Sequence, residues 1–271
     1  MTKKALFLDI DGTLVTDDKE IPPENSRALE RVLEQGHCVV ISTGRPLYSA
    51  VQMARELNLT GKGNYLIAFN GGILYDIYNK KSIFRLPVPM DCVKELFMEA
   101  EKRALHIQTY DSDHVVVDRR CDDEEVRMYC SKVRMDFRIL ESIDELEEEP
   151  VKLLAINMDD VKPLEEFKAW IDANMGDRVS AFFSNFQYLE IVCKGLNKGH
   201  ALRQMAQILG VPVKDTVAAG DQANDVDMVA AAGTGCAMAN GTDEIKKVAD
   251  YVTRRDNNHA GVAEIIERFV L

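Results

Sequence analysis

Short apolar runs alternate with amphipathic segments near the start of the chain. The runs Ala5–Ile10, Cys38–Ile41 and Leu66–Phe69 have the length and composition that are typical of buried strands. The segments between them place apolar residues at helical spacing, and we expect these two helices to end at Gly36 and near Leu57. Consecutive strands that are joined by helices pair in parallel through right-handed crossovers. This part of the chain therefore predicts a parallel sheet.

The alternation is interrupted in the middle of the chain and resumes towards its end. Ile73–Leu86 has the pattern of a hairpin that turns at Asn79-Lys80, and Pro87 and Pro89 mark a boundary after it. The patterns that follow predict helices at 91–102, 123–133 and 164–174 and strands at 106–110, 115–118, 153–158 and 179–183. Beyond these, they predict strands at 189–192, 216–220 and 236–238 and helices at 198–209, 224–232, 243–249 and 261–269.

We interpret the chain as an α/β protein with a Rossmann-like parallel-sheet core and an inserted smaller α/β domain. The core is expected to comprise residues 1–86 and 188–271, and the insert residues 87–187. A chain of 271 residues, 46% of them hydrophobic, is long enough and apolar enough for a core that carries a second domain.

Two aspartates directly follow the first strand, in the sequence Asp9-Ile10-Asp11-Gly12-Thr13. Strand alternation places Asp9 and Asp11 on the same side, at the carboxyl end of a parallel strand, where ligands bind in such sheets. Two adjacent carboxylates repel each other unless a cation or protons compensate. One of them can serve as a nucleophile and the other as an acid and base. Asp and Gly are also common in plain turns, so this motif alone leaves both interpretations open.

A second acidic motif, Gly220-Asp221-Gln222-Ala223-Asn224-Asp225, follows another apolar strand. Asp221, Asn224 and Asp225 offer hard oxygen donors of the kind that magnesium prefers, together with waters and a phosphate oxygen. The alternative is that these side chains only cap the helix that follows.

Two further features lie at helix starts. The sequence Thr43-Gly44-Arg45 follows the second strand, and its hydroxyl and backbone N–H groups are suited to hold a phosphate at a helix N-terminus. Lys198 opens a later helix, where a lysine can neutralise phosphate charge and keep a nucleophilic carboxylate ionised. An N-capping threonine and a solvated lysine are the alternatives for either feature taken alone.

The conjunction of these features favours phosphoryl transfer, because their strand ends and helix starts can converge on one edge of a parallel sheet. In this interpretation Asp9 attacks phosphorus, and Asp11 protonates the leaving oxygen and later activates water. Thr43 and Lys198 bind the transferring phosphoryl group, and Mg²⁺ held by Asp9, Asp11 and Asp221 offsets its charge.

The order of the four motifs resembles that of the haloacid dehalogenase (HAD) superfamily of phosphohydrolases, over nearly the whole chain. Asn70-Gly71-Gly72 and the segments 237–241 and 257–262 resemble the Cof-type branch of subclass IIB. That branch carries a mixed α/β cap between its second and third motifs, where we place the insert. The resemblance implies that Asp9 is the nucleophile, that Asp11 is the acid-base residue and a magnesium ligand through its backbone carbonyl, and that Asp221 is the third magnesium contact.

The resemblance also implies supporting and substrate-binding residues. Asn224 and Asp225 would support the metal ion and Lys198, and Arg45 and Asn70 would lie near the substrate. The residues that we expect to contact substrate are Gly44, Arg45, Asn70 and Asn224. Ala223 departs from the family, since many relatives have Glu there, and we expect a small effect. The branch acts on sugar phosphates, nucleotides and phosphorylated cofactors, so the expected partner is a small phosphorylated metabolite.

The overall charge limits the classes of partner. The chain has 33 basic and 45 acidic residues, a formal net charge of -12, so it repels nucleic acid and anionic membrane surfaces on average. No stretch approaches the ~18 apolar residues of a membrane span, and we expect a cytoplasmic protein. Two alternatives stay open: a noncatalytic phosphate-sensing protein, which would not need Asp11, and a phosphomutase, which would return the phosphoryl group to a sugar.

Overall fold

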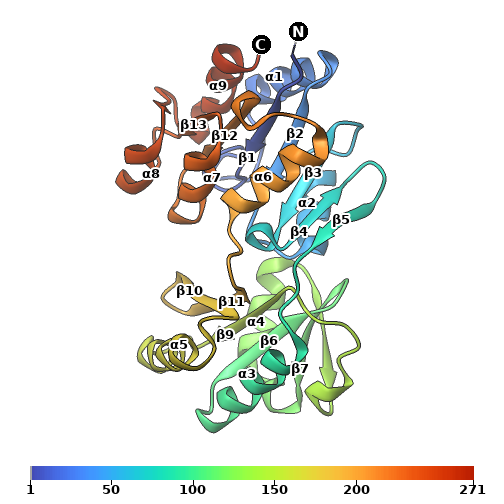
Figure 1. The fold of residues 1–271 in the computed structure, drawn as a ribbon, viewed down its shortest axis with the longest axis vertical. Coiled ribbons are helices and arrows are strands. Elements are labelled where there is room, and N and C mark those ends of the chain that lie inside the picture. The colour runs from blue at the N-terminus through green and yellow to red at the C-terminus, as the bar shows by residue number, and fades with distance from the viewer. Residues whose placement is uncertain (1) are drawn as a thin grey trace. The chain divides into compact units, whose positions relative to one another are not determined.

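The computed structural model describes residues 2–271, which form two sheets, each with its own helices (Figure 1). The chain divides into two compact units. The first unit comprises residues up to Gly44, Ala50–Phe84 and Asn197–Leu271, and the second comprises Arg45–Ser49 and Arg85–Leu196. Among residues 2–271, no helix is both long and apolar enough to cross a bilayer.

The first unit contains an eight-stranded sheet with the order β14-β13-β12-β1-β2-β3-β4-β5. Its strands are β1 (Ala5–Leu8), β2 (Cys38–Ser42), β3 (Asn64–Ala68), β4 (Ile73–Asp76), β5 (Lys81–Arg85), β12 (Thr216–Gly220), β13 (Thr234–Ala237) and β14 (Tyr251–Val252). Strands β14 to β3 are parallel to one another, and β4 is antiparallel to β3. Because β1 pairs with β2 on one side and with β12 on the other, the chain order switches at β1. Such a switch point is where parallel sheets bind ligands.

Helices cover both faces of the central strand β1, since all four of its residues are fully buried. Phe7 and Val40 share a hydrophobic cluster with Leu202, Met205 and Met228, which belong to α6 and α7. Helix α1 packs on β2 and on α9. The helices of this unit are α1 (Pro23–Glu34), α6 (Lys198–Leu209), α7 (Val226–Ala231), α8 (Asp243–Val248) and α9 (Gly261–Phe269), and α2 (Leu47–Glu56) begins in the short segment that is grouped with the second unit.

The second unit contains a six-stranded sheet with the order β10-β11-β9-β6-β7-β8. Its strands are β6 (His106–Tyr110), β7 (His114–Asp118), β8 (Asp136–Leu140), β9 (Lys152–Ile156), β10 (Val179–Asn185) and β11 (Tyr188–Cys193). Its helices are α3 (Met90–Lys102), α4 (Glu124–Val133) and α5 (Lys162–Met175). β7 and β8 pair in parallel, whereas the other neighbours in this sheet pair antiparallel.

The predicted fold class is confirmed, whereas one strand was placed in the wrong sheet. We expected Leu189–Val192 to begin the second part of the core, but it is β11, which is hydrogen-bonded to β9 and β10 in the second sheet. The antiparallel hairpin that β11 forms with β10 keeps the two strands together. The sequence analysis also missed the strand β8, whose exposed residues mask its alternation, and the two-residue strand β14.

Candidate active site

Lys198 lies at the centre of a buried cluster in the first unit. Its Nζ donates hydrogen bonds to Asp9 Oδ1 at 2.7 Å and to Asp225 Oδ1 at 2.6 Å, and a third to the backbone oxygen of Ser42 at 3.2 Å. Lys198 is the first residue of α6, and the Asn197 side chain caps that helix by accepting from the His200 N–H. The lysine side chain is fully buried. Three strand ends, those of β1, β2 and β12, are thus brought together at one ammonium group.

Asp225 is held on both of its carboxylate oxygens. Oδ1 accepts from Lys198, and Oδ2 accepts from the backbone N–H groups of Asp221 and Gln222 at 3.1 and 3.2 Å. The close approach of this side chain to β12 needs a glycine, because a Cβ on Gly220 would collide with it. Asp225 is therefore a structural link between Lys198 and the loop that carries Asp221.

Asp221 faces the loop that follows β1. Its Oδ1 accepts a hydrogen bond from the fully buried Thr13 hydroxyl at 3.1 Å, and its Oδ2 accepts from Gln222 at 3.2 Å. Gly12 has a φ of +78°, which disfavours other residues, and a Cβ there would collide with the Asp221 carboxylate. The sequence analysis gave Thr13 no role, although it belongs to the Asp9–Thr13 motif.

The cluster holds more acid than base, and its pKa values reflect this imbalance. Burial, reinforced by the Asp225 carboxylate, raises the pKa of Asp9 to about 8, although Lys198 acts in the opposite direction. Burial acts to lower the pKa of Lys198, but the carboxylates of Asp225 and Asp9 outweigh it and raise the pKa above its usual value. Burial and Asp225 also raise the pKa of Asp221. An additional positive charge beside these carboxylates would favour their ionised forms.

The donor set fits a hard divalent cation. Asp9, Asp221 and Asp225 each offer a carboxylate oxygen, and these oxygens lie within 4.8 Å of one another. Oxygen ligands, mostly carboxylates, are those that Mg²⁺ prefers. The Asp225 carboxylate is held by the Lys198 ammonium and by two backbone N–H groups, whereas Asp9 and Asp221 follow the neighbouring strands β1 and β12, so we expect these two residues to hold the ion. Two of the three residues that the sequence assigned to the metal thus lie together.

Thr43 and Gly44, which follow β2, and Asn70, which follows β3, form a second part of the site. Thr43 and Asn70 are buried, and the Asn70 N–H donates to the Thr43 backbone oxygen at 3.0 Å. Asn70 has a φ of 55°, and its side chain lies so close to Gly44 that a Cβ there would be 3.0 Å from Oδ1. The structure therefore brings Asn70 to the Thr43-Gly44 loop, as the sequence had suggested only through family resemblance.

Three sequence-predicted residues lie outside the buried cluster. Asp11 is partly exposed, and its Oδ1 lies 2.8 Å from Lys19 Nζ. Asn224 is exposed on the short turn Ala223–Asp225. Arg45 belongs to the segment that is grouped with the second unit. The sequence analysis did not single out Lys19, because an isolated lysine in a polar turn carries no signal.

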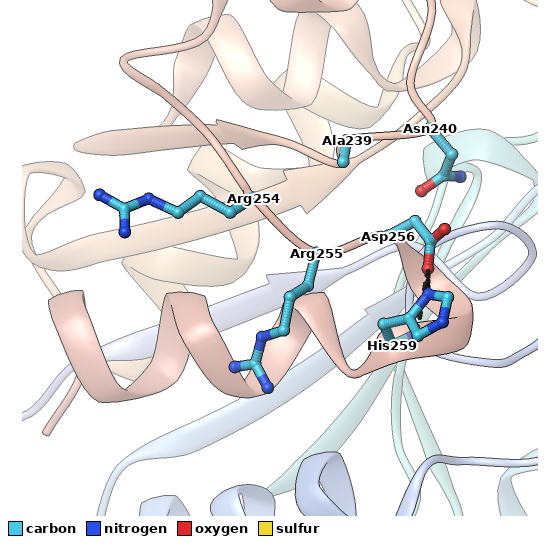
Figure 2. A pocket seen from close by; sticks show the side chains of 6 residues that line it. All are labelled: Ala239, Asn240, Arg254, Arg255, Asp256 and His259. Carbon is cyan, nitrogen blue, oxygen red and sulfur yellow. Dashed lines mark hydrogen bonds and ion pairs between the residues drawn. The ribbon is translucent and has the colours of Figure 1, made fainter.

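A cavity of 460 Å³ adjoins the loop after β1, since Asn240 in its wall donates to the Gly12 backbone oxygen at 2.8 Å. It is lined by Ala239, Asn240, Arg254, Arg255, Asp256 and His259. Figure 2 shows that the side chains of Arg254 and Arg255 point away from each other and that His259 is turned to Asp256. His259 Nδ1 lies 2.6 Å from Asp256 Oδ1. The positive charges do not converge on one point, and the cavity is not part of the cluster around Lys198.

Comparison with known proteins shows a match over most of the chain. A family model described as haloacid dehalogenase-like hydrolase matches residues 6–266. The crystal structure of a haloacid dehalogenase-like hydrolase from Bacteroides thetaiotaomicron is similar with a TM-score of 0.89 and 31% identity, covering 98% of this chain and 99% of that chain.

Two curated relatives are named for their substrates. The 5-amino-6-(5-phospho-D-ribitylamino)uracil phosphatase YitU of Bacillus subtilis is 28% identical over 282 residues, which cover 99% of this chain and 98% of the relative. The pyridoxal phosphate phosphatase YbhA of Escherichia coli is 28% identical over 279 residues, with 98% of both chains covered.

Proposed function

The chain belongs to the haloacid dehalogenase-like hydrolases as a phosphatase of the Cof-type branch, and we propose that it hydrolyses a small phosphorylated metabolite through an aspartyl-phosphate on Asp9. One observation carries the proposal. A fully buried lysine lies 2.7 Å from Asp9, at the end of β1, and 2.6 Å from Asp225, after β12. Burying three charged groups costs free energy, so their presence here indicates a functional role. A lysine beside Asp9 favours the ionised, nucleophilic form of that carboxylate.

The proposed reaction has two steps, and in each step one proton moves to or from Asp11. In the first, a carboxylate oxygen of Asp9 bonds to phosphorus, the ester P–O bond breaks, and the leaving oxygen takes a proton from Asp11. In the second, Asp11 accepts a proton from water as the water oxygen bonds to phosphorus, and the bond to Asp9 breaks. Inorganic phosphate leaves, Asp9 is again a carboxylate, and Asp11 is again protonated.

The other residues of the site bind the phosphoryl group. The Thr43 hydroxyl and the backbone N–H groups of Gly44 and Arg45 are suited to hold its oxygens, because they precede α2. Lys198 offsets negative charge as it moves between phosphorus and Asp9. Asn70 fixes the Thr43-Gly44 loop through its backbone hydrogen bond, and we assign Arg45, Asn70 and Asn224 to contacts with the substrate.

A divalent cation is implied by the family, and we propose that it is Mg²⁺, held by Asp9, Asp221 and the backbone oxygen of Asp11. Bound there, it would reduce the repulsion between the substrate phosphate and the carboxylates of the site. The raised pKa values of Asp9 and Asp221 support this proposal, because they mark carboxylates that lack sufficient positive charge.

The names of the relatives guide the choice of substrate class. YitU is named for a phosphorylated ribitylaminouracil and YbhA for pyridoxal phosphate. Both compounds combine a phosphate monoester with a heterocyclic ring. We therefore propose that the substrate is a phosphorylated cofactor or its precursor, a nucleotide or a sugar phosphate.

The test is phosphate release from p-nitrophenyl phosphate and from a panel of these three classes, with Mg²⁺ and with chelator. Asp9→Asn preserves the shape of the side chain and should lower turnover by roughly 10⁴-fold or more, since it removes the nucleophile. Asp18→Asn, a change at an exposed aspartate of the same loop, is the matched control and should retain turnover.

Mass spectrometry of the intact protein after rapid quenching should detect a phosphoenzyme in the wild type but not in Asp9→Asn. Turnover that survives in Asp9→Asn would contradict the nucleophile assignment. Unchanged turnover in chelator would contradict the role of the cation.

A further inference from the structure

Lys19 makes a contact that the proposed mechanism does not use. Its Nζ lies 2.8 Å from Asp11 Oδ1, with the lysine side chain 57% exposed and the aspartate side chain 41% exposed. An ion pair of this exposure adds about 0–1 kcal/mol to stability. The contact therefore contributes little to stability. Because its acidic partner is Asp11, the proposed acid-base residue, a role in the reaction is the better explanation.

The backbone of Lys19 is in a conformation that a lysine disfavours. Its φ is 66°, in the left-handed region, where residues other than Gly, Asn and Asp are uncommon. The turn that holds it is closed by three hydrogen bonds. The Thr16 N–H donates to Glu20 O at 2.9 Å, the Lys19 N–H donates to Thr16 O at 3.0 Å, and the Glu20 N–H donates to the Thr16 hydroxyl at 3.3 Å. Backbone strain of this kind persists only where the surroundings fix it.

A distant segment of the chain fixes the same turn from outside. The Asn258 side chain bonds Asp17 twice, accepting from its N–H at 3.0 Å and donating to its Oδ2 at 3.1 Å. Asn257, which is buried, donates to Asp17 Oδ1 at 3.2 Å and to Val15 O at 3.0 Å. The turn that carries Lys19 is thus attached to the segment before α9, more than two hundred residues later in the chain.

The other end of the contact is fixed as well. Asp11 forms an isolated parallel bridge with Val15, and the Gly12 backbone oxygen accepts from the Asn240 side chain at 2.8 Å. Both Asp11 and Lys19 therefore extend from backbone that is held by the last part of the chain. These hydrogen bonds hold the loop in the conformation in which the two side chains meet.

We propose that Lys19 is a positioning residue that holds the Asp11 carboxyl group in the orientation for proton transfer. The inference rests on the proposed function, because it takes Asp11 as the acid-base residue. Lys19 touches neither phosphorus nor the leaving group in this scheme. It acts by donating to Oδ1 of Asp11, which limits rotation of the carboxyl group during attack by Asp9 and leaves Oδ2 as the oxygen that carries the transferred proton.

A positioning role for the acid has a kinetic signature. A strongly basic leaving oxygen needs a proton as the P–O bond breaks, whereas a weakly basic one can leave as an anion. Loss of a residue that orients the acid should therefore slow esters of basic alcohols and phenols more than esters of acidic phenols. A residue with only a structural role would slow both to the same extent.

The test compares phenyl phosphate with p-nitrophenyl phosphate, which have similar shapes but differ in the basicity of the leaving oxygen. We expect Lys19→Met to lower kcat/KM for phenyl phosphate about tenfold or more and for p-nitrophenyl phosphate by at most about threefold. Lys19→Arg should restore both values to within about threefold, because it keeps the charge. Lys80→Met is the matched control, since Lys80 is an exposed lysine with a φ of 52° in the β4–β5 turn, and it should change neither value.

Each outcome bears on one claim. Equal losses for the two esters, or no loss in Lys19→Met, overturn the role of Lys19 and leave the phosphatase proposal standing. If Asp9-dependent release is absent from both esters in the wild type, the proposed function itself fails. Circular dichroism and the Tm of Lys19→Met should match the wild type, because the exposed pair adds little stability.

Discussion

The two units of the molecule bury charge in different ways. In the first unit, one lysine, Lys198, faces the carboxylates of Asp9 and Asp225, and Asp221 lies within 4.8 Å of both. In the second unit, two buried basic side chains each lie beside a carboxylate. His106 lies 2.7 Å from Asp123, and the Lys152 ammonium lies 3.5 Å from Glu190.

The pKa values show what this difference means. In the first unit, burial together with the surplus of acid raises the pKa of Asp9 to about 8. In the second, burial acts to raise the pKa of Asp123, but the hydrogen bond and charge attraction of His106, together with backbone N–H groups, outweigh it and hold that pKa below its usual value. A buried acid that faces a buried base indicates a structural pair. A buried surplus of carboxylates indicates a site that is completed by a ligand.

The largest effect should come from removing the lysine of the unbalanced cluster. Lys198→Met leaves buried carboxylates without their cation, so we expect loss of turnover by roughly 10³-fold or more and of stability by about 3–5 kcal/mol. Turnover and urea unfolding measure the two losses. Lys152→Met is the matched buried lysine of the second unit and should lower stability but reduce turnover of p-nitrophenyl phosphate less than tenfold. Equal loss of turnover in both variants would remove the distinction between the units.

Magnesium should stabilise the protein through the first unit alone. A cation that binds only the folded state adds about 2.7 kcal/mol at a concentration of one hundred times its Kd. We expect calorimetry to show a higher Tm with Mg²⁺ for the wild type and no increase for Asp221→Asn. Asp123→Asn changes the second unit and should retain the full increase. An increase in Tm that survives in Asp221→Asn would mean that the cation binds elsewhere.

The smallest effect is expected from the pair in the second unit. Burial acts to lower the pKa of His106, but the hydrogen bonds and charge interactions with Asp123 and Cys121 together outweigh it and raise the pKa to about 10. A histidine whose pKa is higher in the folded state adds stability below its unfolded pKa of about 6.5, and this is lost as pH rises towards 10. We expect a contribution of about 1.5–3 kcal/mol, as for hydrogen bonds to charged groups.

Asp123→Asn isolates this pair from the helix that it caps. Asn keeps an N-cap for α4, where Asp123 accepts from the Val126 N–H at 3.1 Å, but it removes the charge. The unfolding free energy of the wild type should therefore fall more steeply between pH 6.5 and 10 than that of the variant. Parallel pH profiles would show that His106 is not charged in the folded protein.

Much of the site could be predicted because local sequence patterns determine where its residues leave a strand or begin a helix. A short apolar strand followed by Asp9 and Asp11 fixes where those carboxylates emerge, and Lys198 is the first residue of the predicted helix. Parallel pairing of β1 with β12 then brings Asp221 to the same edge. The phosphatase class and the Cof-type resemblance are confirmed by the comparisons.

What could not be predicted depends on pairing between distant segments. The sequence of β11 is apolar enough for either sheet, and only its hydrogen bonds with β9 and β10 decide between them. In the same way, nothing near Lys19 in the sequence indicates that Asn257 and Asn258 fix its turn. Such contacts join residues whose local patterns are independent.

The link between Asp9 and Lys198 spans 189 residues of sequence, and this has a consequence for synthesis of the chain. The central strand β1 leaves the ribosome well before the lysine and its neighbour β12, which lie much later in the sequence. Contacts of such long range close late, because the entropy of a large loop opposes them. A nascent chain therefore contains Asp9 long before the site around it can form. Activity should appear only after Lys198 and β12 have been synthesised and have folded against β1.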